Sequence, residues 1–470
     1  MFNFTGTYTD QYQLAMGQVY FLKGKKELVA VFDYFFRDLP FGGGYAVFAG
    51  LEDLLGIVEA LRFDGDDIAF VREQGLDPQF VRYLERFRFT GNIYSSREGD
   101  LVFPTRPVLI VEAPIIEAQI IETLLLNILN HETLIATKAS RMRQAAGHRT
   151  LIDFGLRRAH GPGGYYASRA AIVGGFDATS NVRVGRDYGV AVSGTMAHSF
   201  IQSYDDELAA FRDFAEGRPE GCVLLVDTYD SLQSGIPNAI TVAKQMEQRG
   251  RRLLAIRLDS GDLAYLSKQA RRMLDAAGLD YVRIAASNQL DEYLIKSLLA
   301  QDAPIDIFGV GTRLLTGQPD AALDGVYKLA FVNGRPRIKL SETTAKVTLP
   351  CLKQVLRVRN GDGRFFGADA VMLADEQDVA TMHHPFDPFR SLSIGSHAKE
   401  PLLHLVMEKG RRKQKPRSLP EISAYRQARM DRLPAEYKRF ENPHIYKVGL
   451  SDGLKKERDR LIADHRRGYL

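Results

Sequence analysis

The centre of the chain alternates short apolar segments with longer amphipathic ones. Four apolar segments begin at residues 223, 253, 282 and 305, and each ends abruptly in polar or glycine residues. Between the second and third segments, residues 262–277 place Leu263, Leu266, Ala270 and Leu274 on one side of a helix. Alternation of strands and helices at this spacing predicts parallel strands in an α/β domain.

Polar residues follow each of these predicted strands. The carboxyl ends of parallel strands meet at one edge or mouth, which is where α/β proteins bind their ligands. We therefore expect either a barrel or an open α/β site. The residues expected around its mouth are Asp227, Arg257, Asp259, Ser287, Asn288, Gly311 and Thr312.

The two ends of the chain show other patterns. Residues 1–105 mix short aromatic runs with glycine-rich turns, residues 341–400 favour strands and loops, and residues 416–470 favour charged helices. Residues 115–144 predict one long helix, because apolar residues recur there every four positions. We expect an N-terminal α+β lobe with this helix over residues 1–140, a barrel over 141–340, and a segment over 341–470 that packs back on the lobe.

Composition excludes several classes of protein. With 470 residues, 45% of them apolar and 26% charged, the chain is globular and long enough for two or three packed units. Its apolar stretch at 108–129 carries Glu112, Glu117 and Glu122, so we expect no membrane span. The N-terminus lacks the pattern of a secretory signal, and two cysteines cannot form a disulfide framework, so we expect a cytoplasmic protein.

The charge of the chain does not indicate nucleic-acid binding. The formal net charge is +4, and the dense basic run is confined to residues 409–417. This run contains no aromatic residues on which bases could stack, so we interpret it as a solvated loop in preference to an RNA or DNA contact.

Two segments at the predicted mouth could bind phosphate or ribose. No Walker-type phosphate loop occurs, but Gly309–Thr312 offers two glycines, backbone amides and a hydroxyl before a predicted helix. The segment Asp259–Asp262 fits either a turn that caps a helix or a binding edge for ribose hydroxyls or for Mg²⁺ shared with a polyphosphate.

A histidine and an arginine pair are further candidates. His198 follows the predicted strand at residues 190–193, and Asp227 at the end of the next strand could hold one ring nitrogen and leave the other nucleophilic. Arg157 and Arg158 could bind a carboxylate or phosphate above a pocket. Residue pattern alone thus predicts an α/β enzyme that binds a small anionic, phosphorylated substrate.

Nine motifs, in order along almost the whole chain, resemble the nicotinate phosphoribosyltransferase family. They are Thr9–Leu14; Pro40–Tyr45 with Phe48–Leu51; Asp153–Arg158; Gly175–Asn181; Gly194–Ser199; Asp227–Asp230; Arg257–Asp262; Gly309–Thr312; and Tyr327–Leu329. The resemblance implies a type II phosphoribosyltransferase: an irregular α/β barrel with a second α+β lobe formed by both chain ends, working as a homodimer. One departure is the lack of the cysteines that form a zinc knuckle in some members.

The resemblance also implies a reaction and its participants. Nicotinate and 5-phosphoribosyl 1-diphosphate would give nicotinate mononucleotide and diphosphate, coupled to hydrolysis of ATP and supported by Mg²⁺. His198 would be the phosphorylated histidine and Asp227 its orienting carboxylate. The remaining roles fall on substrate-binding residues: Phe154 and, from the partner subunit, Tyr12 around the pyridine ring; Arg157, Thr195 and Arg257 on the carboxylate or phosphate; Asp259 on the ribose; Gly311 and Thr312 on the 5-phosphate; and Ser287 at the mouth.

Two alternatives stay open. A nicotinamide or quinolinate phosphoribosyltransferase would share the barrel, although the motifs at 156–158 and 195–199 resemble the nicotinate enzymes more closely. A catalytically silent binding protein on the same scaffold is the other alternative. The presence of His198, Asp227, Arg257 and Asp259 argues against it.

Overall fold

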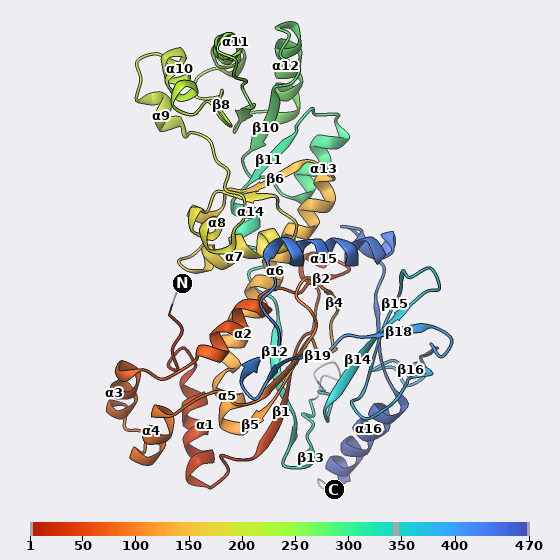
Figure 1. Ribbon diagram of the computed structural model, residues 1–470. Coiled ribbons are helices and arrows are strands. Elements are labelled where there is room, and N and C mark those ends of the chain that lie inside the picture. Colours follow the sequence, from red (N-terminus) through yellow and green to blue (C-terminus); the bar gives the residue numbers. More distant parts are fainter. Residues whose placement is uncertain (1–2, 342–346, 468–470) are drawn as a thin grey trace. The chain divides into compact units, whose positions relative to one another are not determined.

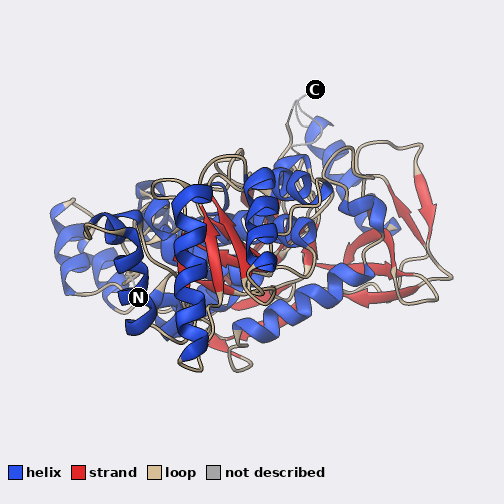
Figure 2. Cartoon of the chain, turned by 90° about the horizontal axis from the view of Figure 1, so that it is seen from above, coloured by secondary structure: helices blue, strands red, loops and turns tan. Residues whose placement is uncertain are grey.

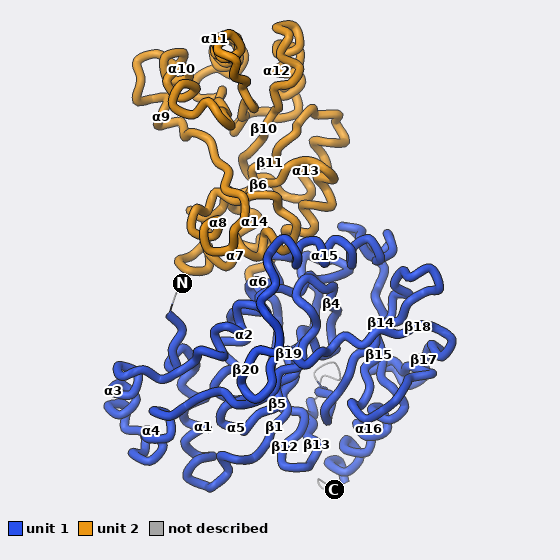
Figure 3. Tube along the Cα trace, viewed as in Figure 1, with its two compact units in different colours: residues 1–137, 322–470 blue, residues 138–321 orange. Residues whose placement is uncertain are grey.

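The computed structural model describes residues 3–341 and 347–467 of the chain (Figure 1). It divides into two compact units. Unit 1 comprises residues 1–137 and 322–470, and unit 2 comprises residues 138–321 (Figure 3). Unit 1 is therefore built from both ends of the chain, and unit 2 is one continuous stretch between them.

Unit 2 contains a six-stranded sheet in the order β7-β6-β11-β10-β9-β8, curled into a half-barrel. Every neighbouring pair in this sheet is parallel. The strands are β6 (Thr150–Asp153), β7 (Ala178–Thr179), β8 (Val223–Leu225), β9 (Ala255–Leu258), β10 (Arg283–Ser287) and β11 (Ile307–Val310). The four strands predicted from apolar segments are thus confirmed, as is their parallel arrangement.

Helices connect the parallel strands of unit 2. Figure 2 shows the helices of the chain in blue and its strands in red. They are α7 (Gly163–Val173), α8 (Val182–Tyr188), α9 (His198–Gln202), α10 (Glu207–Gly217), α11 (Ile236–Gln248), α12 (Leu263–Ala276), α13 (Glu292–Ala300) and α14 (Thr312–Leu315). One face of the sheet carries the small apolar side chains of Ala178, Ala255 and Ala285, packed with Ile152 and Ile307. Small residues suit the inside of a strongly curled sheet, where side chains converge.

Unit 1 contains two large sheets. The first has the order β13-β12-β1-β5-β3-β19-β20 and is antiparallel, and the second has the order β17-β16-β21-β15-β14-β18. The strands are β1 (Val29–Phe36), β2 (Ala46–Val47), β3 (Asn92–Ser95), β4 (Leu101–Val102), β5 (Leu109–Pro114), β12 (Gly325–Val332), β13 (Arg335–Pro336), β14 (Lys353–Arg359), β15 (Phe365–Leu373), β16 (Thr381–His383), β17 (Ser391–Ser393), β18 (Ala398–Pro401), β19 (His404–Glu408), β20 (Arg411–Arg412) and β21 (Lys447–Leu450).

Unit 1 also contains α-helices. They are α1 (Gln11–Leu22), α2 (Leu51–Ala60), α3 (Gly65–Glu73), α4 (Pro78–Glu85), α5 (Ile115–Ile120), α15 (Leu419–Arg432), α16 (Asp452–Arg467) and the first part of α6 (Glu122–Ala146). The core joins one face of β1 to the apolar faces of α2, α5 and α6. No helix in the described ranges is both long and apolar enough to cross a membrane.

Two expectations differ from the observed elements. The helix expected over residues 115–144 is interrupted at Ile121, so that α5 and α6 are separate helices. The boundary expected at residue 340 also differs, because β12 pairs with β1 in the sheet of unit 1. The observed units accordingly meet in the sequence at residues 137/138 and 321/322, where the expectation was 140/141 and 340/341.

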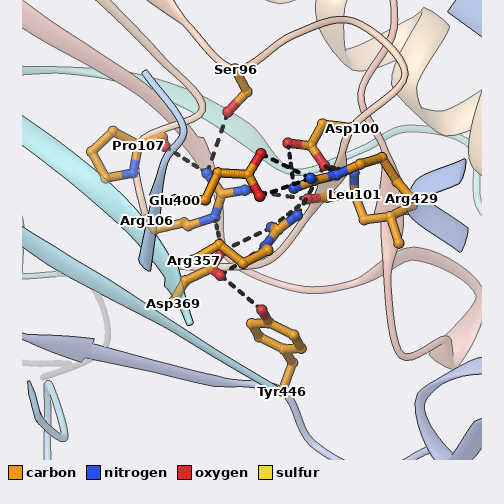
Figure 4. Close-up of polar contacts among 10 residues, drawn as sticks. All are labelled: Ser96, Asp100, Leu101, Arg106, Pro107, Arg357, Asp369, Glu400, Arg429 and Tyr446. Atoms are coloured by element: carbon orange, nitrogen blue, oxygen red, sulfur yellow. Dashed lines mark hydrogen bonds and ion pairs between the residues drawn. The ribbon is translucent and has the colours of Figure 1, made fainter. Parts of the chain in front are cut away.

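A buried cluster of charged side chains joins the chain ends within unit 1 (Figure 4). Arg357 on β14 donates to both carboxylate oxygens of its cross-strand neighbour Asp369, at 2.9 and 3.0 Å, and to Asp100 at 2.9 Å. Arg429 on α15 donates to Asp100 at 2.8 Å, and Arg106 forms an ion pair with Asp369 at 2.9 Å. The cluster thus links residues from positions 100–106, 357–369 and 429.

Asp100 in this cluster is ionised although it is buried. Burial opposes ionisation of Asp100, but the charges of Arg357, Arg429 and Arg106 outweigh this effect and hold the pKa of Asp100 below its ordinary value. Glu400 accepts from Arg429 at 2.9 Å, and the Tyr446 hydroxyl donates to Asp369 at 2.8 Å. Paired and hydrogen-bonded charges of this kind are costly to break from one side, because the remaining partner is left buried and uncompensated.

We predict that Asp369→Asn lowers the free energy of unfolding by about 3–5 kcal/mol, because Arg357 and Arg106 lose a buried counter-charge. Urea unfolding at pH 7 measures the change. The matched control is Asp362→Asn, in the turn between β14 and β15, where the carboxyl is largely exposed. For this variant we expect the free energy of unfolding to change by less than about 0.5 kcal/mol. Equal losses in the two variants would contradict the role of the cluster.

Candidate active site

Residues at the carboxyl ends of β8, β9 and β10 form one hydrogen-bonded network. The backbone N–H of Asp259, just after β9, donates to Asp227 Oδ2, just after β8, at 2.8 Å. Arg257 on β9 reaches in both directions: its Nη2 donates to Asp259 Oδ1 at 2.7 Å, and its Nε donates to Ser287 Oγ at 2.8 Å. Ser287 ends β10 and also donates to Asp259 Oδ1. The parallel register therefore brings together four residues that the sequence placed at one mouth.

The Asp259 carboxylate is the electrostatic centre of this network. Burial opposes its ionisation, but the charge of Arg257 and the hydrogen bonds from Ser287 and Arg257 outweigh burial and lower its pKa. The charge of His198 contributes in the same direction. Asp259 is consequently an anion at neutral pH, suited to accept hydrogen bonds from sugar hydroxyls or to face a developing cation.

The Asp227 side chain is almost fully buried and stabilises the turn after β9. Its Oδ2 also accepts from Ser260 Oγ at 2.6 Å, while Oδ1 lacks a hydrogen-bond partner among the described residues. A buried carboxylate oxygen without a partner is unusual, because its desolvation is uncompensated. Here it points to a ligand, a metal ion or a protonated histidine as the missing partner.

His198 is the first residue of α9, and its side chain is about two-fifths exposed. Its Nε2 lies 4.0 Å from Asp227 Oδ1 and 3.9 Å from Asp259 Oδ2, so the two carboxylates face the ring without direct hydrogen bonds. Its Nδ1 lies 3.1 Å from Thr228 Oγ1. Thr228, adjacent to Asp227, is thus the hydrogen-bond partner that the sequence analysis did not single out. The strand expected at residues 190–193 is reduced to a bridge between Val192 and Thr179.

Phe154 follows β6 and presents an aromatic ring beside the network. The Arg257 guanidinium carbon lies 5.3 Å from the ring centroid, within the range of a cation–π contact. Gly309 on β11 makes room for the ring, because a Cβ at that position would lie 2.3 Å from it. Gly309 therefore allows the Phe154 ring to pack against the backbone of β11. The sequence pattern of residues 309–312 indicated a phosphate-binding segment and did not indicate this packing role.

Asp153 positions the loop that carries Phe154. It is fully buried, accepts from the Gly155 N–H at 2.7 Å, and accepts from Thr179 Oγ1 at 2.7 Å. Burial raises its pKa, and these hydrogen bonds oppose the rise. Asp153 belongs to one of the nine motifs, but its positioning role depends on partners that only the folded structure brings together.

Other elements carry the remaining predicted site residues. Thr195 Oγ1 donates to the Val223 carbonyl at 2.7 Å, which fixes the loop before His198 against β8. Thr312 is the first residue of α14, shortly after β11, and Gly311 is the N-cap residue of that helix. Arg157 is exposed in a short 3₁₀ helix, Leu156–Arg158. Tyr12 belongs to unit 1, on α1, and 47% of its surface is exposed.

Comparison with known proteins identifies the family. Sequence models of the nicotinate phosphoribosyltransferase N-terminal domain, family and C-terminal domain match residues 7–130, 150–387 and 352–458. The nicotinate phosphoribosyltransferase of Bacillus subtilis is 44% identical over 95% of this chain and 92% of its own. The chain belongs to the nicotinate phosphoribosyltransferase family. The Dictyostelium discoideum nicotinate phosphoribosyltransferase is 36% identical over 95% of this chain and 86% of its own.

Solved structures agree with this family assignment. The human nicotinic acid phosphoribosyltransferase superposes with a TM-score of 0.86 at 31% identity, covering 96% of this chain and 99% of its own. A nicotinate-nucleotide pyrophosphorylase from Pyrococcus furiosus superposes with a TM-score of 0.72 at 26% identity, covering 91% and 95%. The type II phosphoribosyltransferase fold expected from the nine motifs is therefore confirmed.

We predict that Ser287→Ala lowers the free energy of unfolding by an amount that depends on pH. Because the pKa of Asp259 is lower in the folded than in the unfolded state, its anion stabilises the fold above the ordinary aspartate pKa of 3.8, and this contribution is lost as the pH falls through the folded value. Loss of the Ser287 donor raises the pKa of Asp259 in the folded state. We therefore expect the free energy of unfolding of Ser287→Ala to be about 1–2 kcal/mol below that of the wild type at pH 7, and the difference to be smaller at pH 3.

Urea unfolding at the two pH values measures this deficit. The matched control is Ser203→Ala, an exposed serine of unit 2 whose hydroxyl donates to a backbone carbonyl. Any loss in the free energy of unfolding of Ser203→Ala should be the same at pH 7 and pH 3. A deficit for Ser287→Ala that is the same at pH 7 and pH 3 would contradict the coupling to Asp259.

Proposed function

We propose that the protein condenses nicotinate with 5-phosphoribosyl 1-diphosphate to give nicotinate mononucleotide and diphosphate in NAD biosynthesis or salvage. The observation that carries the proposal is the network of Asp227, Arg257, Asp259 and Ser287 at the carboxyl edge of a parallel sheet, in a chain of this family. The network offers a fixed guanidinium for an anionic substrate and fixed carboxylates for a sugar, on rigid strand ends.

The proposed reaction uses these groups for positioning and charge stabilisation. As the C1–oxygen bond to diphosphate breaks, the sugar C1 becomes cationic and the pyridine nitrogen forms the new bond to it. The Asp259 anion would accept from the ribose hydroxyls and stabilise the cationic sugar, and Arg257 would bind an anionic group of the substrates. Phe154 would hold one face of the pyridine ring, with Tyr12 of a partner subunit proposed for the other.

Further residues would complete the binding of the phosphates. Gly311 and Thr312 are proposed to bind the 5-phosphate through backbone N–H groups and a hydroxyl, and Arg157 and Thr195 to contact a carboxylate or phosphate. The part of the chain that the structure describes contains no group of three or more His, Cys, Asp and Glu side chains able to hold a metal ion. Mg²⁺ commonly takes one or two protein carboxylates and substrate phosphates, and the unpartnered Asp227 Oδ1 suits that mode.

The coupling to ATP is a finer part of the proposal. The contact between His198 Nδ1 and Thr228 Oγ1 leaves Nε2 as the free nucleophilic nitrogen, and the partial exposure of the ring gives access to a phosphate donor. Nε2 would attack the γ-phosphorus of ATP, ADP would leave, and water would later cleave the P–N bond. The carboxylates of Asp227 and Asp259, both about 4 Å from Nε2, would stabilise a protonated ring.

A second candidate reaction starts from quinolinate. A quinolinate phosphoribosyltransferase would share the barrel, and the Pyrococcus furiosus neighbour, which carries the name nicotinate-nucleotide pyrophosphorylase, superposes with a TM-score of 0.72. The deciding experiment measures nucleotide formation from nicotinate, nicotinamide and quinolinate in parallel, each with and without ATP. We expect product from nicotinate, with a higher yield when ATP is present. Product from quinolinate or nicotinamide in preference to nicotinate would overturn the proposal.

The cytoplasmic location stays a prediction from the sequence.

We predict that His198 is the phosphoryl acceptor. Incubation with γ-labelled ATP should give a protein-bound label that is labile to acid and stable to base, and His198→Ala should abolish it. The control is His160→Ala, an exposed histidine of the same unit, which should label fully. The His198→Ala protein should retain some ATP-independent product formation, because the strand-end network still positions the substrates. Undiminished labelling of His198→Ala would exclude this role.

We also predict a homodimer in which each active site uses Tyr12 of the partner subunit. Mixing Tyr12→Ala and His198→Ala under conditions of subunit exchange puts both lesions in one site of a mixed dimer and leaves the other site intact. With random pairing of equal amounts, about a quarter of all sites should regain full activity, because a two-fold dimer has two equivalent sites. Activity that stays at the mean of the two parents would mean that Tyr12 serves its own subunit or no site.

A further inference from the structure

Unit 1 contains a cavity of about 220 Å³ to which none of the predicted site residues contributes. It lies against β1 of the first sheet, helix α16 and the segment that follows β16. Its walls are mainly apolar and aromatic, and they include Phe35, Pro107, Leu349, Phe386, Pro388 and Ile462. A largely apolar cavity with a few polar groups is the usual form of a small-molecule site.

One of those polar groups is Asp33, a carboxylate on an otherwise apolar strand face. Side chains alternate along β1, so that Val31, Asp33 and Phe35 share one face, while Phe32 and Tyr34 enter the main core on the other. Only 3% of Asp33 is exposed. An acid at this position is destabilising unless it is paired, so its presence calls for a physical reason.

The Asp33 carboxylate is only half satisfied among the described residues. Its Oδ2 forms an ion pair with Lys353 Nζ at 2.9 Å, whereas its Oδ1 is buried and has no hydrogen-bond partner. Burial raises the pKa of Asp33 to about 6, and Lys353 opposes the rise, so the group is an anion at neutral pH. A buried carboxylate oxygen in this state lacks a donor, and a ligand in the cavity that Asp33 lines could supply it.

The charges around the cavity define what kind of donor fits. Lys353 already compensates the charge of Asp33. Lys455 and Arg458, which also line the cavity, share the carboxylate of Asp459, at 3.0 and 2.7 Å, which leaves one positive charge in excess. A cationic ligand therefore gains no net attraction here. A neutral N–H donor on a flat apolar body satisfies Asp33 and also fits the walls.

We propose that this cavity is a second small-molecule site, which binds neutral planar compounds of one or two rings bearing an amide or amino N–H, with the N–H directed at Asp33. The ring of the ligand packs among Phe35, Phe386 and Pro388. The hydroxyls of Thr105 and Thr348, which also line the cavity, are available to its carbonyl or ring acceptors. The proposal is independent of the reaction assigned to unit 2.

Two isosteric probes test the proposal: 4-fluorobenzamide, and 4-fluoroacetophenone in which a methyl replaces the amide NH₂. Fluorine NMR of the probes in the presence of the full-length protein gives both dissociation constants. We expect the amide to bind about three- to tenfold more tightly than the ketone, the worth of one hydrogen bond to a buried acceptor. Equal affinity for the two probes, or no binding of either at millimolar concentration, would overturn the proposal.

Three variants locate the binding. In Asp33→Leu/Lys353→Met, which removes both charges of the pair at similar volume, the preference for the amide should vanish while the ketone still binds. Ile462→Trp on α16 should fill the cavity and abolish binding of both probes, whereas His465→Trp, exposed on the same helix, should leave both constants unchanged. Phe154→Ala in unit 2 should also leave them unchanged. An amide preference that survives in the Asp33 variant, or that is lost in Phe154→Ala, would place the binding elsewhere.

Discussion

The parallel register of β8, β9, β10 and β11 is the constraint on which the candidate active site depends. In this register Arg257 lies opposite Leu225 on one side and Ala285 on the other, so that strand ends distant in sequence stop at the same edge. Residues at the carboxyl end of one strand can then form hydrogen bonds with residues at the carboxyl end of the neighbouring strand. The Asp259 N–H to Asp227 contact and the Arg257 to Ser287 contact are both of this kind. Rigid strands thus hold charged groups whose mutual positions set the pKa of Asp259.

The second constraint is the buried charge cluster of unit 1. A unit made from both chain ends must hold together segments that are more than 200 residues apart in sequence, and the cluster does so with directed contacts. Arg357 lies between Asp369 on β15 and Glu400 on β18 in the sheet register and reaches Asp100 from the N-terminal part (Figure 4). Apolar packing alone would specify this arrangement less strictly, because it has no preferred direction.

Much of unit 2 could be predicted because its signals are local. An apolar segment followed by a polar residue marks a strand and its carboxyl end, and the alternation with helices implies that these ends meet. The partners within the site were not predictable in the same way. Thr228, Ser260 and Asp153 act through hydrogen bonds whose existence depends on loop conformation and side-chain rotamers.

Unit 1 was harder to predict because its defining contacts are distant in sequence. Residues 325–332 form β12, but nothing in their own sequence says that this strand pairs with β1. The charged residues of β14 lie at alternate positions, as in a strand with one solvent-facing side, and β15 has Asp369 as its one charged residue. The sequence does not indicate that Arg357 and Asp369 are a buried pair. The break at Ile121 was likewise unmarked, because no glycine or proline interrupts the apolar repeat there.

The central claim is that the carboxyl edge of the parallel sheet in unit 2 binds the substrates. The most direct test is a crystal structure of the protein with nicotinate mononucleotide and Mg²⁺. We expect the pyridine ring against Phe154, the ribose hydroxyls within hydrogen-bond distance of Asp259, and the phosphate at Gly311 and Thr312. A nucleotide bound away from the ends of β9, β10 and β11, with the network of Arg257, Asp259 and Ser287 untouched, would contradict it.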